Sequence, residues 1–215
     1  METVFIHGLG QAPSSWNKTL AAIPAQGSVS LPDLPALLRG QAATYPRLYH
    51  AFEKYCEELP GALNLCGISL GAILALHYTI CHPQKVNTLV LIAAQYKMPV
   101  FLLKFQNFLF RFMPKASFSR LGFTKKDVIS LTSTMTGLDF SAKPNHISCA
   151  TLLLCGQKDA ANQKATKSLG VHIPEAEVYF VEHAGHAVNE EAPEALGAIL
   201  AFFYKRHARA FVDLL

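Results

Sequence analysis

A short apolar run that leads into a glycine-flanked serine is the feature that most restricts how this chain can fold. Leu63–Cys66 is typical of a buried strand, Gly67-Ile-Ser69-Leu-Gly71 follows it directly, and the uncharged residues Leu70–His82 are typical of a helix. Such a strand passes into a helix only through a sharp turn, and the two glycines remove the side chains that would collide there. We therefore predict that this turn exposes the Ser69 hydroxyl at the end of the strand.

Short apolar runs alternate with longer helical runs along the whole chain, which predicts an α/β domain. Because the runs are apolar at nearly every position, the strands should form a mostly parallel sheet of about six strands with helices on both faces. The expected strands are Thr3–Ile6, Val29–Leu31, Leu63–Cys66, Val86–Ile92, Thr151–Cys155 and Glu177–Val181. The expected helices are Tyr49–Leu59, Leu70–His82, Asn162–Gly170 and Pro193–Phe203.

One region departs from this alternation. Phenylalanines recur at spacings of four, three and four residues, which predicts an amphipathic helix, and Thr124 is a candidate cap for a second helix. We expect residues 1–94 and 149–215 to form the core, and residues 95–148 to form a small helical cap over the carboxyl edge of the sheet. An ordinary additional helical layer is the alternative. The phenylalanines, which are candidate substrate-binding residues, are Phe101, Phe105, Phe108 and Phe112.

The positive charge is concentrated in one part of the sequence. The net charge is only +4, but Leu59 to Lys126 contains eight Lys and Arg residues and no Asp or Glu. Without a recognisable nucleic-acid-binding module, this predicts no nucleic-acid partner. An anionic substrate group, an acidic acyl carrier protein or an acidic membrane surface would be attracted instead. Alternatively, the phenylalanines merely pack the cap onto the sheet and the charges keep it soluble.

The cysteines and the N-terminus predict a cytoplasmic setting. The five cysteines are odd in number and lack CxxC spacing, which is typical of reduced core residues, and the N-terminus has no basic region of a signal peptide. Gly61–Cys81 is uncharged and long enough to raise the question of a membrane span, but polar residues interrupt it. No His or Cys cluster has metal-ligand spacing and no nucleotide-binding glycine motif occurs, so we predict no metal and no cofactor.

Three further strings, together with the serine turn, resemble the α/β-hydrolase superfamily over nearly the whole chain except the predicted cap. They are Val4-Phe-Ile-His7-Gly8-Leu9-Gly10, Thr151-Leu-Leu-Leu-Cys-Gly-Gln-Lys-Asp159 and Val181-Glu-His-Ala-Gly-His186. The resemblance implies an α/β-hydrolase fold and a triad of Ser69 as nucleophile, Asp159 as acid and His186 as base. It also implies an oxyanion hole made by the backbone N–H groups of Leu9 and Leu70. The family core has eight strands, and the first two have no counterpart here.

Other residues compete for these roles. His183 is an alternative base, although Gly185 gives the loop the freedom to turn His186 toward the serine. Asp33 is an alternative acid, although an Asp flanked by prolines more often forms a turn. We interpret His7 as a brace for the oxyanion loop, and His77 as a core or surface histidine.

The expected activity is that of a cofactor-independent serine hydrolase acting on a small carboxylic ester or thioester through an acyl-serine intermediate. Because a serine occupies the turn, the resemblance argues against the dehalogenase and epoxide-hydrolase branches. A lyase or an acyl transferase on the same triad is the alternative among enzymes. A non-catalytic ligand receptor and a peripheral membrane-binding protein remain as alternatives of other classes.

Overall fold

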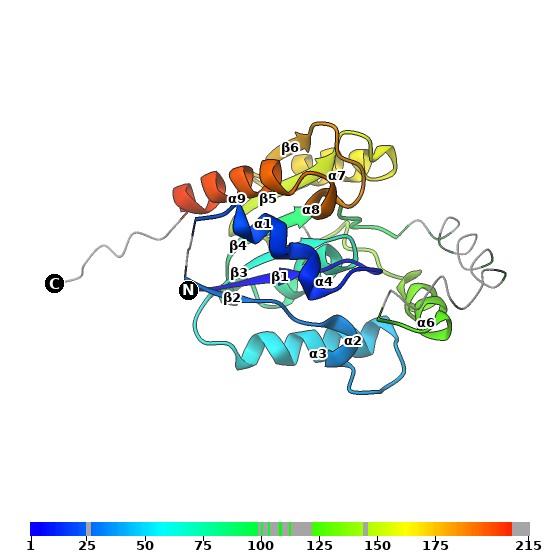
Figure 1. Cartoon of the computed structure of the whole chain (residues 1–215). Coiled ribbons are helices and arrows are strands. Elements are labelled where there is room, and N and C mark those ends of the chain that lie inside the picture. Colours follow the sequence, from blue (N-terminus) through cyan, green and yellow to red (C-terminus); the bar gives the residue numbers. More distant parts are fainter. Residues whose placement is uncertain are drawn as a thin grey trace.

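The computed structural model describes residues 1–24, 27–98, 100, 103, 108, 112, 122–143 and 146–207. Its centre is a sheet of six strands in the order β2-β1-β3-β4-β5-β6, and every neighbouring pair is parallel (Figure 1). The strands are β1 (Glu2–Ile6), β2 (Ser28–Ser30), β3 (Leu63–Ile68), β4 (Val86–Ile92), β5 (Ala150–Gly156) and β6 (Glu177–Val181). The predicted fold class is confirmed, and each predicted strand lies within two residues of the observed one.

Helices pack on both faces of the sheet. The α-helices are α1 (Asn17–Ala21), α2 (Leu34–Leu37), α3 (Tyr45–Glu58), α4 (Leu70–Cys81), α6 (Lys125–Met135), α7 (Ala160–His172), α8 (Val188–Glu191) and α9 (Pro193–His207). Two 3-10 turns, η1 (Pro13–Trp16) and η2 (Pro83–Lys85), precede α1 and β4. One apolar cluster joins the sheet to α3, α4 and α7, and a second joins it to η1, α8 and α9.

The continuous apolar strands follow from this layering. In β4, Leu89 and Leu91 belong to the first cluster, whereas Val90 belongs to the second. Successive side chains of a strand point to opposite faces, so a strand covered on both faces is apolar at most positions. The absence of polar alternation in the sequence therefore indicated the parallel, doubly covered sheet.

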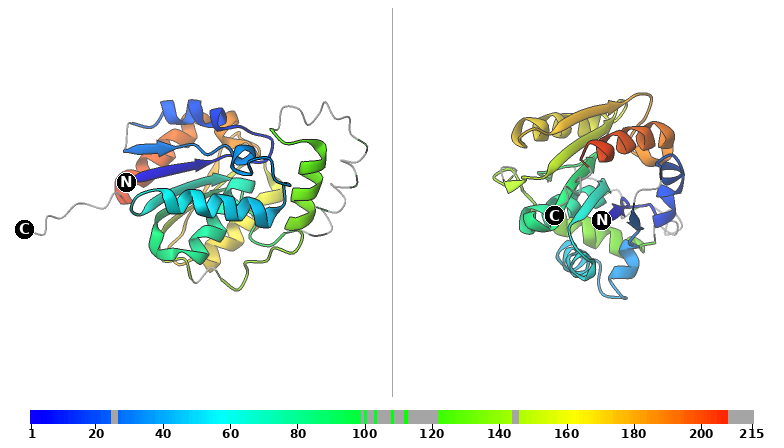
Figure 2. Two further views of the ribbon diagram at one scale, coloured as in Figure 1. Left: turned by 90° about the horizontal axis from the view of Figure 1, so that it is seen from below. Right: turned by 90° about the vertical axis from the view of Figure 1, so that its left-hand side faces the viewer.

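The predicted site residues follow strands that end at one edge of the sheet. Because all strands are parallel, their carboxyl ends lie side by side. Leu9 follows β1, Ser69 follows β3, Asp159 follows β5 and His186 follows β6. Helix α6 lies beyond this same edge (Figure 2).

Helix α6 begins at the predicted cap. The Thr124 hydroxyl accepts a hydrogen bond from the Asp127 N–H (3.2 Å), and the Asp127 carboxylate accepts one from the Thr124 N–H (3.0 Å). Val128 and Leu131 of this helix are buried in the cluster that contains α3. Helix α6 is thus anchored to the core, while the assignment of residues 95–148 to a separate cap stays a prediction.

The differences from the predicted elements have local causes. Helix α3 begins at Tyr45 rather than Tyr49, with Pro46 in its first turn. A proline is tolerated in the first turn of a helix, although its ring would break the helix at an interior position. The short helices α1, α2 and α8 were not predicted, since one turn is too short to show a helical period.

The uncharged stretch Gly61–Cys81 consists of β3 and α4 rather than a single helix. Within the described ranges, no helix combines the length and the apolar character needed to cross a bilayer. All five cysteines are free; Cys56, Cys66 and Cys155 are buried, whereas Cys81 is exposed.

Candidate active site

Ser69 occupies a strained backbone conformation between β3 and α4. Its φ of 54° and ψ of −115° lie in a region that L-residues rarely adopt, and its N–H donates to the Ile92 carbonyl (2.9 Å). A Cβ on Gly67 would collide with the backbone of Gly71, and a Cβ on Gly71 would collide with the carbonyl oxygens of Ile6 and His7. The two glycines of the motif therefore permit the tight turn and the close approach of α4 to β1.

His7 supports the loop after β1 through two hydrogen bonds. Its Nε2 accepts a hydrogen bond from the Leu34 N–H (3.1 Å), so its Nδ1 carries the proton and donates to the Gly8 carbonyl (2.9 Å). Burial lowers the pKa of His7 below the ordinary value of 6.5, which favours this neutral form. The geometry agrees with the interpretation of His7 as a brace rather than a reacting group.

The two candidate oxyanion donors lie near Ser69. Leu9, Ser69 and Leu70 line the same cavity. The N–H of Leu70 stands at the first position of α4, where a helix leaves its amides without internal partners. The N–H of Leu9 makes no hydrogen bond to any part of the chain that the structure describes. Both amides are therefore free to bind an oxygen atom of a ligand.

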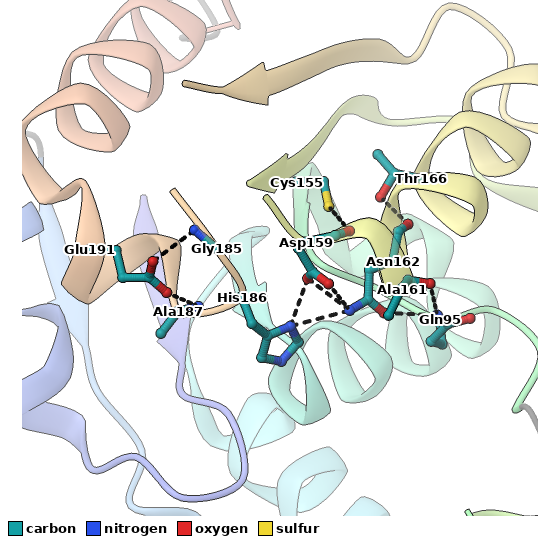
Figure 3. Close-up of polar contacts among 10 residues, drawn as sticks. All are labelled: Gln95, Cys155, Asp159, Ala161, Asn162, Thr166, Gly185, His186, Ala187 and Glu191. Carbon is teal, nitrogen blue, oxygen red and sulfur yellow. Dashed lines mark hydrogen bonds and ion pairs between the residues drawn. The ribbon is translucent and has the colours of Figure 1, made fainter. Parts of the chain in front are cut away.

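His186 and Asp159 form a direct hydrogen bond. His186 Nδ1 lies 2.8 Å from Asp159 Oδ2, and the side chains are 51% and 6% exposed respectively (Figure 3). A buried carboxylate that binds Nδ1 holds the proton there and leaves Nε2 as the basic nitrogen. The Ser69 hydroxyl has no hydrogen-bond partner among the described residues, so a bond from Ser69 to Nε2 is not part of this structure.

The loop that carries His186 is held by a carboxylate on α8. Glu191 accepts hydrogen bonds from the N–H groups of Gly185 (2.7 Å) and Ala187 (3.1 Å), which flank the histidine in sequence (Figure 3). On the other side, a Cβ on Gly156 would collide with the carbonyl of Gly185. The histidine loop therefore packs directly against the end of β5, next to Asp159.

None of the competing residues makes a contact with the Asp159–His186 pair. His183 is exposed and its N–H donates to the Gln157 side chain (3.4 Å). Asp33 caps α2 by accepting from the Ala36 N–H (3.3 Å), as expected of a turn residue.

His77 lies on α4, facing α3. Its Nδ1 contacts the Tyr45 hydroxyl (3.1 Å), and its ring stacks on Tyr49 at a centroid distance of 3.7 Å. Burial lowers the pKa of His77, which favours a neutral, structural imidazole.

A cavity of about 780 Å³ lies beside Ser69 and extends toward α6 and α7. Most of its wall is apolar, which suits the hydrocarbon part of a ligand, while a few polar groups lie around it. The apolar lining residues include Leu9, Leu70, Ile73, Met98, Val100, Leu103, Met135 and Ala165. The polar ones include Gln95, Tyr96, Lys97, Asn162, Lys164 and Ser168.

The predicted aromatic stripe does not contribute its described members to this wall. Phe101 and Phe105 lie outside the described residues. Phe108 and Phe112 are 54% and 75% exposed, their rings are 5.1 Å apart, and neither lines the cavity. The same segment reaches the cavity through Val100 and Leu103 instead.

Two of the described cations of the basic stretch have structural partners. Lys97 forms an ion pair with Asp139 (2.9 Å), and Lys85 donates to the Leu59 carbonyl (2.9 Å). Lys104, Arg111, Lys115 and Arg120 lie outside the described residues. Lys164, at the cavity, has no ion-pair partner among the residues that the structure describes. Among all the residues that the structure describes, no cluster of His, Cys, Asp or Glu has the arrangement of a metal site.

Sequence reasoning missed three polar residues around Asp159 and His186: Gln95, Asn162 and Glu191. Asn162 stands three residues after Asp159, in the first turn of α7. This spacing places the Asn162 side chain next to Asp159, which immediately precedes the helix. That spacing was the available signal for Asn162. Gln95 and Glu191 reach the site only through the tertiary structure.

Comparison with known proteins gives a consistent result. A sequence model described as the alpha/beta hydrolase family matches residues 3–199. A pimeloyl-(acyl-carrier protein) methyl ester esterase of Aromatoleum aromaticum is 35% identical over 106 residues, which are 49% of this chain and 41% of that protein. A protein of Bacillus subtilis named as a 2-succinyl-6-hydroxy-2,4-cyclohexadiene-1-carboxylate synthase is 24% identical, over 93% of this chain and 89% of its own.

Among solved structures, a thermophilic esterase from Thermogutta terrifontis superposes with a TM-score of 0.76. It is 19% identical, and the superposition covers 96% of this chain and 90% of that chain. At this identity the likeness concerns the fold.

The backbone approach at Gly71 predicts a stability effect. Gly71→Ala should lower the free energy of unfolding by about 3 kcal/mol or more, because the added methyl would overlap the backbone of β1 rather than a movable side chain. Urea denaturation followed by circular dichroism measures this change. Gly137→Ala is the matched control, since nothing lies within 4 Å of its added Cβ. Equal stability of the two variants would contradict the assigned role of Gly71.

Proposed function

The chain belongs to the alpha/beta hydrolase family, and from this premise we propose that it is a serine hydrolase that cleaves a carboxylic ester or thioester. One observation carries the proposal. A serine in a strained strand-to-helix turn and a histidine bonded to a buried aspartate stand at the same edge of the sheet, and the serine lines a large apolar cavity. Serine nucleophiles need this combination, because the hydroxyl reacts only when a base takes its proton.

The proposed mechanism assigns one step to each group. The Ser69 oxygen attacks the carbonyl carbon while His186 Nε2 accepts the hydroxyl proton, and Asp159 stabilises the resulting imidazolium. The N–H groups of Leu9 and Leu70 bind the oxyanion of the tetrahedral intermediate. The imidazolium then protonates the leaving oxygen or sulfur as its bond to the carbonyl carbon breaks, which releases the alcohol or thiol and leaves an acyl-serine. His186 next takes a proton from a water molecule that attacks the acyl-serine, and returns this proton to the Ser69 oxygen as the acid leaves.

The cavity supports an acyl group of some length as the substrate part. Its apolar wall next to Ser69 would bury the hydrocarbon chain, and each buried methylene contributes up to about 0.8 kcal/mol. Medium-chain esters should therefore be better substrates than acetate. An acyl group delivered by an acidic carrier protein is a narrower proposal. It is supported by Lys164 at the cavity, which has no ion-pair partner among the described residues, and by the name of the Aromatoleum aromaticum relative.

A lyase on the same triad is the second candidate. The relative from Bacillus subtilis, which is named as a synthase and not as an esterase, aligns with nearly the whole chain, although the identity is lower. In that reaction class the histidine would remove a proton from carbon and no acyl-serine would form. Covalent labelling of Ser69 alone does not distinguish a hydrolase from a lyase. A burst of product from an activated ester does, because it requires an acyl-serine.

Replacement of the nucleophile tests the proposal directly. Ser69→Ala should keep the fold and lower kcat for ester hydrolysis by on the order of 10⁴-fold or more, because the members of a triad act as a unit. Hydrolysis of a p-nitrophenyl ester series and labelling by a fluorophosphonate probe measure the effect. A variant that keeps more than about a tenth of the wild-type turnover would remove Ser69 from the mechanism.

The acid is tested by comparing two aspartates. Asp159→Asn should lower kcat by roughly 10³- to 10⁴-fold, since an amide at this position favours the wrong imidazole tautomer. Asp33→Asn should leave kcat unchanged, because asparagine caps a helix as well as aspartate does. His186→Ala should lower kcat at least as much as Asp159→Asn, because Ser69 then has no base to accept its proton. The reverse ranking of the two aspartates would assign the acid to Asp33.

The loop contact of Glu191 predicts a graded effect. Glu191→Ala should lower kcat by about 10-fold, because both amides that flank His186 lose a charged acceptor. Glu191→Gln should lie between this variant and the wild type, since its single carbonyl oxygen replaces one of the two acceptors. Glu194→Ala, an exposed position on the neighbouring helix α9, is the control and should behave as the wild type. Steady-state kinetics of the three variants measure the order, and equal rates would show that the loop does not need Glu191.

A further inference from the structure

Asn162 lies between the acid of the site and the wall of the cavity. Its Nδ2 donates to both carboxylate oxygens of Asp159, at 2.9 and 2.8 Å, and lies 3.2 Å from His186 Nδ1 (Figure 3). The residue is only 8% exposed, so water does not compete freely for these bonds. Since Nδ1 donates to Asp159, the Asn162 amide and the imidazole are neighbouring donors to one carboxylate.

The orientation of the Asn162 amide is set by Gln95. Gln95 Nε2 donates to Asn162 Oδ1 (2.7 Å) and lies 3.4 Å from the Ala161 carbonyl oxygen. An amide has a donor on one side and an acceptor on the other, so a donor at Oδ1 directs Nδ2 toward Asp159. Figure 3 shows the resulting sequence of side chains from Gln95 through Asn162 to Asp159 and His186.

The backbone around Gln95 is itself held in place. Its neighbour Tyr96 accepts a hydrogen bond at its carbonyl from the Phe140 N–H (2.8 Å), and the Tyr96 hydroxyl bonds the Ser168 hydroxyl (2.8 Å). Gln95 therefore approaches Asn162 from a segment that is tied both to residues after α6 and to α7. This support would limit the freedom of the Gln95 side chain to leave Asn162.

We propose that Gln95 and Asn162 are positioning residues of the triad: Gln95 orients the Asn162 amide, and Asn162 holds the Asp159 carboxylate in the position that binds His186. The inference rests on the proposed function and deepens it. Asp159 is almost fully buried, and without Asn162 the only hydrogen-bond partner of its carboxylate among the described residues would be His186. The carboxylate could then rotate out of the orientation in which it accepts the hydrogen bond from His186 Nδ1.

An isosteric substitution tests the orientation. In Gln95→Glu, an acceptor replaces the donor that faces Asn162 Oδ1, so the Asn162 amide turns over and presents its oxygen to the Asp159 carboxylate. We expect kcat for p-nitrophenyl acetate to fall by roughly 10- to 100-fold, as for the loss of a charge-assisted hydrogen bond, with KM nearly unchanged. Gln95→Met only removes the donor and should cost less than Gln95→Glu.

The matched control is Gln163→Glu, which makes the same chemical change one residue after Asn162. The Gln163 side chain donates to the Gln157 carbonyl and does not line the cavity. Gln163 contacts Asp159 through its backbone N–H, which donates to the Asp159 carbonyl (3.1 Å) and is not changed by the substitution. This variant should retain the wild-type kcat. If it lost as much activity as Gln95→Glu, an added charge near α7 would explain both results and the proposal would be overturned.

A double-mutant cycle tests whether Gln95 acts through Asn162. In an Asn162→Ala background, Gln95→Glu should cause no further loss, because no amide remains to be turned. Additive losses would overturn the proposal, as would equal kcat values for Gln95→Glu and the wild type, or an effect confined to KM. If circular dichroism shows that Asn162→Ala is unfolded, the kcat values of Gln95→Glu and Gln95→Met, at a partly exposed position, test the proposal instead. A lower kcat for Gln95→Glu than for Gln95→Met is expected, and equal values would overturn the proposal.

A readout without turnover separates this inference from the proposed function. The proton on His186 Nδ1 should give a downfield NMR resonance that shifts in Gln95→Glu and not in Gln163→Glu. If wild-type protein neither hydrolyses esters nor labels with a fluorophosphonate, the proposed function fails while the resonance still reports on the pair. If wild-type protein is active and both the resonance and kcat are unchanged in Gln95→Glu, only the positioning role fails.

Discussion

The close backbone approach between the start of α4 and the end of β1 is the constraint on which the site depends. Gly71 has no side chain, and its Cα therefore lies against the carbonyl oxygens of Ile6 and His7. This contact places the turn at Ser69 beside the loop of Gly8 and Leu9, so that the serine and both free amides line one cavity. A larger residue would separate these elements, and no substitution of a reactive side chain would compensate for the lost geometry.

A second close approach brings Asp159 and His186 together. Gly156 at the end of β5 admits the backbone of the histidine loop, while Glu191 holds that loop from the opposite side. Asp159 thus receives hydrogen bonds from His186 and Asn162 in a buried position. The candidate catalytic side chains are few, but their positions are determined by glycines, by the Glu191 carboxylate and by amides from distant segments.

Much of the fold could be predicted because its signals are local. The continuous apolar strands predicted the doubly covered sheet, and the strand–Gly67-Ile-Ser69-Leu-Gly71–helix string predicted the strained turn that the structure contains. The phenylalanine stripe was less informative, because a helical period shows which residues share a face but not what that face contacts. Phe108 and Phe112 are exposed, and Val100 and Leu103 of the same segment line the cavity.

The sequence by itself determined which residue types stand at the carboxyl end of each strand, because strand periodicity and the glycine spacing are properties of neighbouring residues. It also predicted the aspartate and histidine strings through their resemblance to a known family. Only the tertiary structure decided which side chains support this aspartate and this histidine. Gln95 lies 67 positions from its partner Asn162, and no local pattern records a hydrogen bond between a segment after β4 and the first turn of α7. Such contacts arise when parallel strands bring their ends together, so their partners are chosen by the packing of the whole sheet.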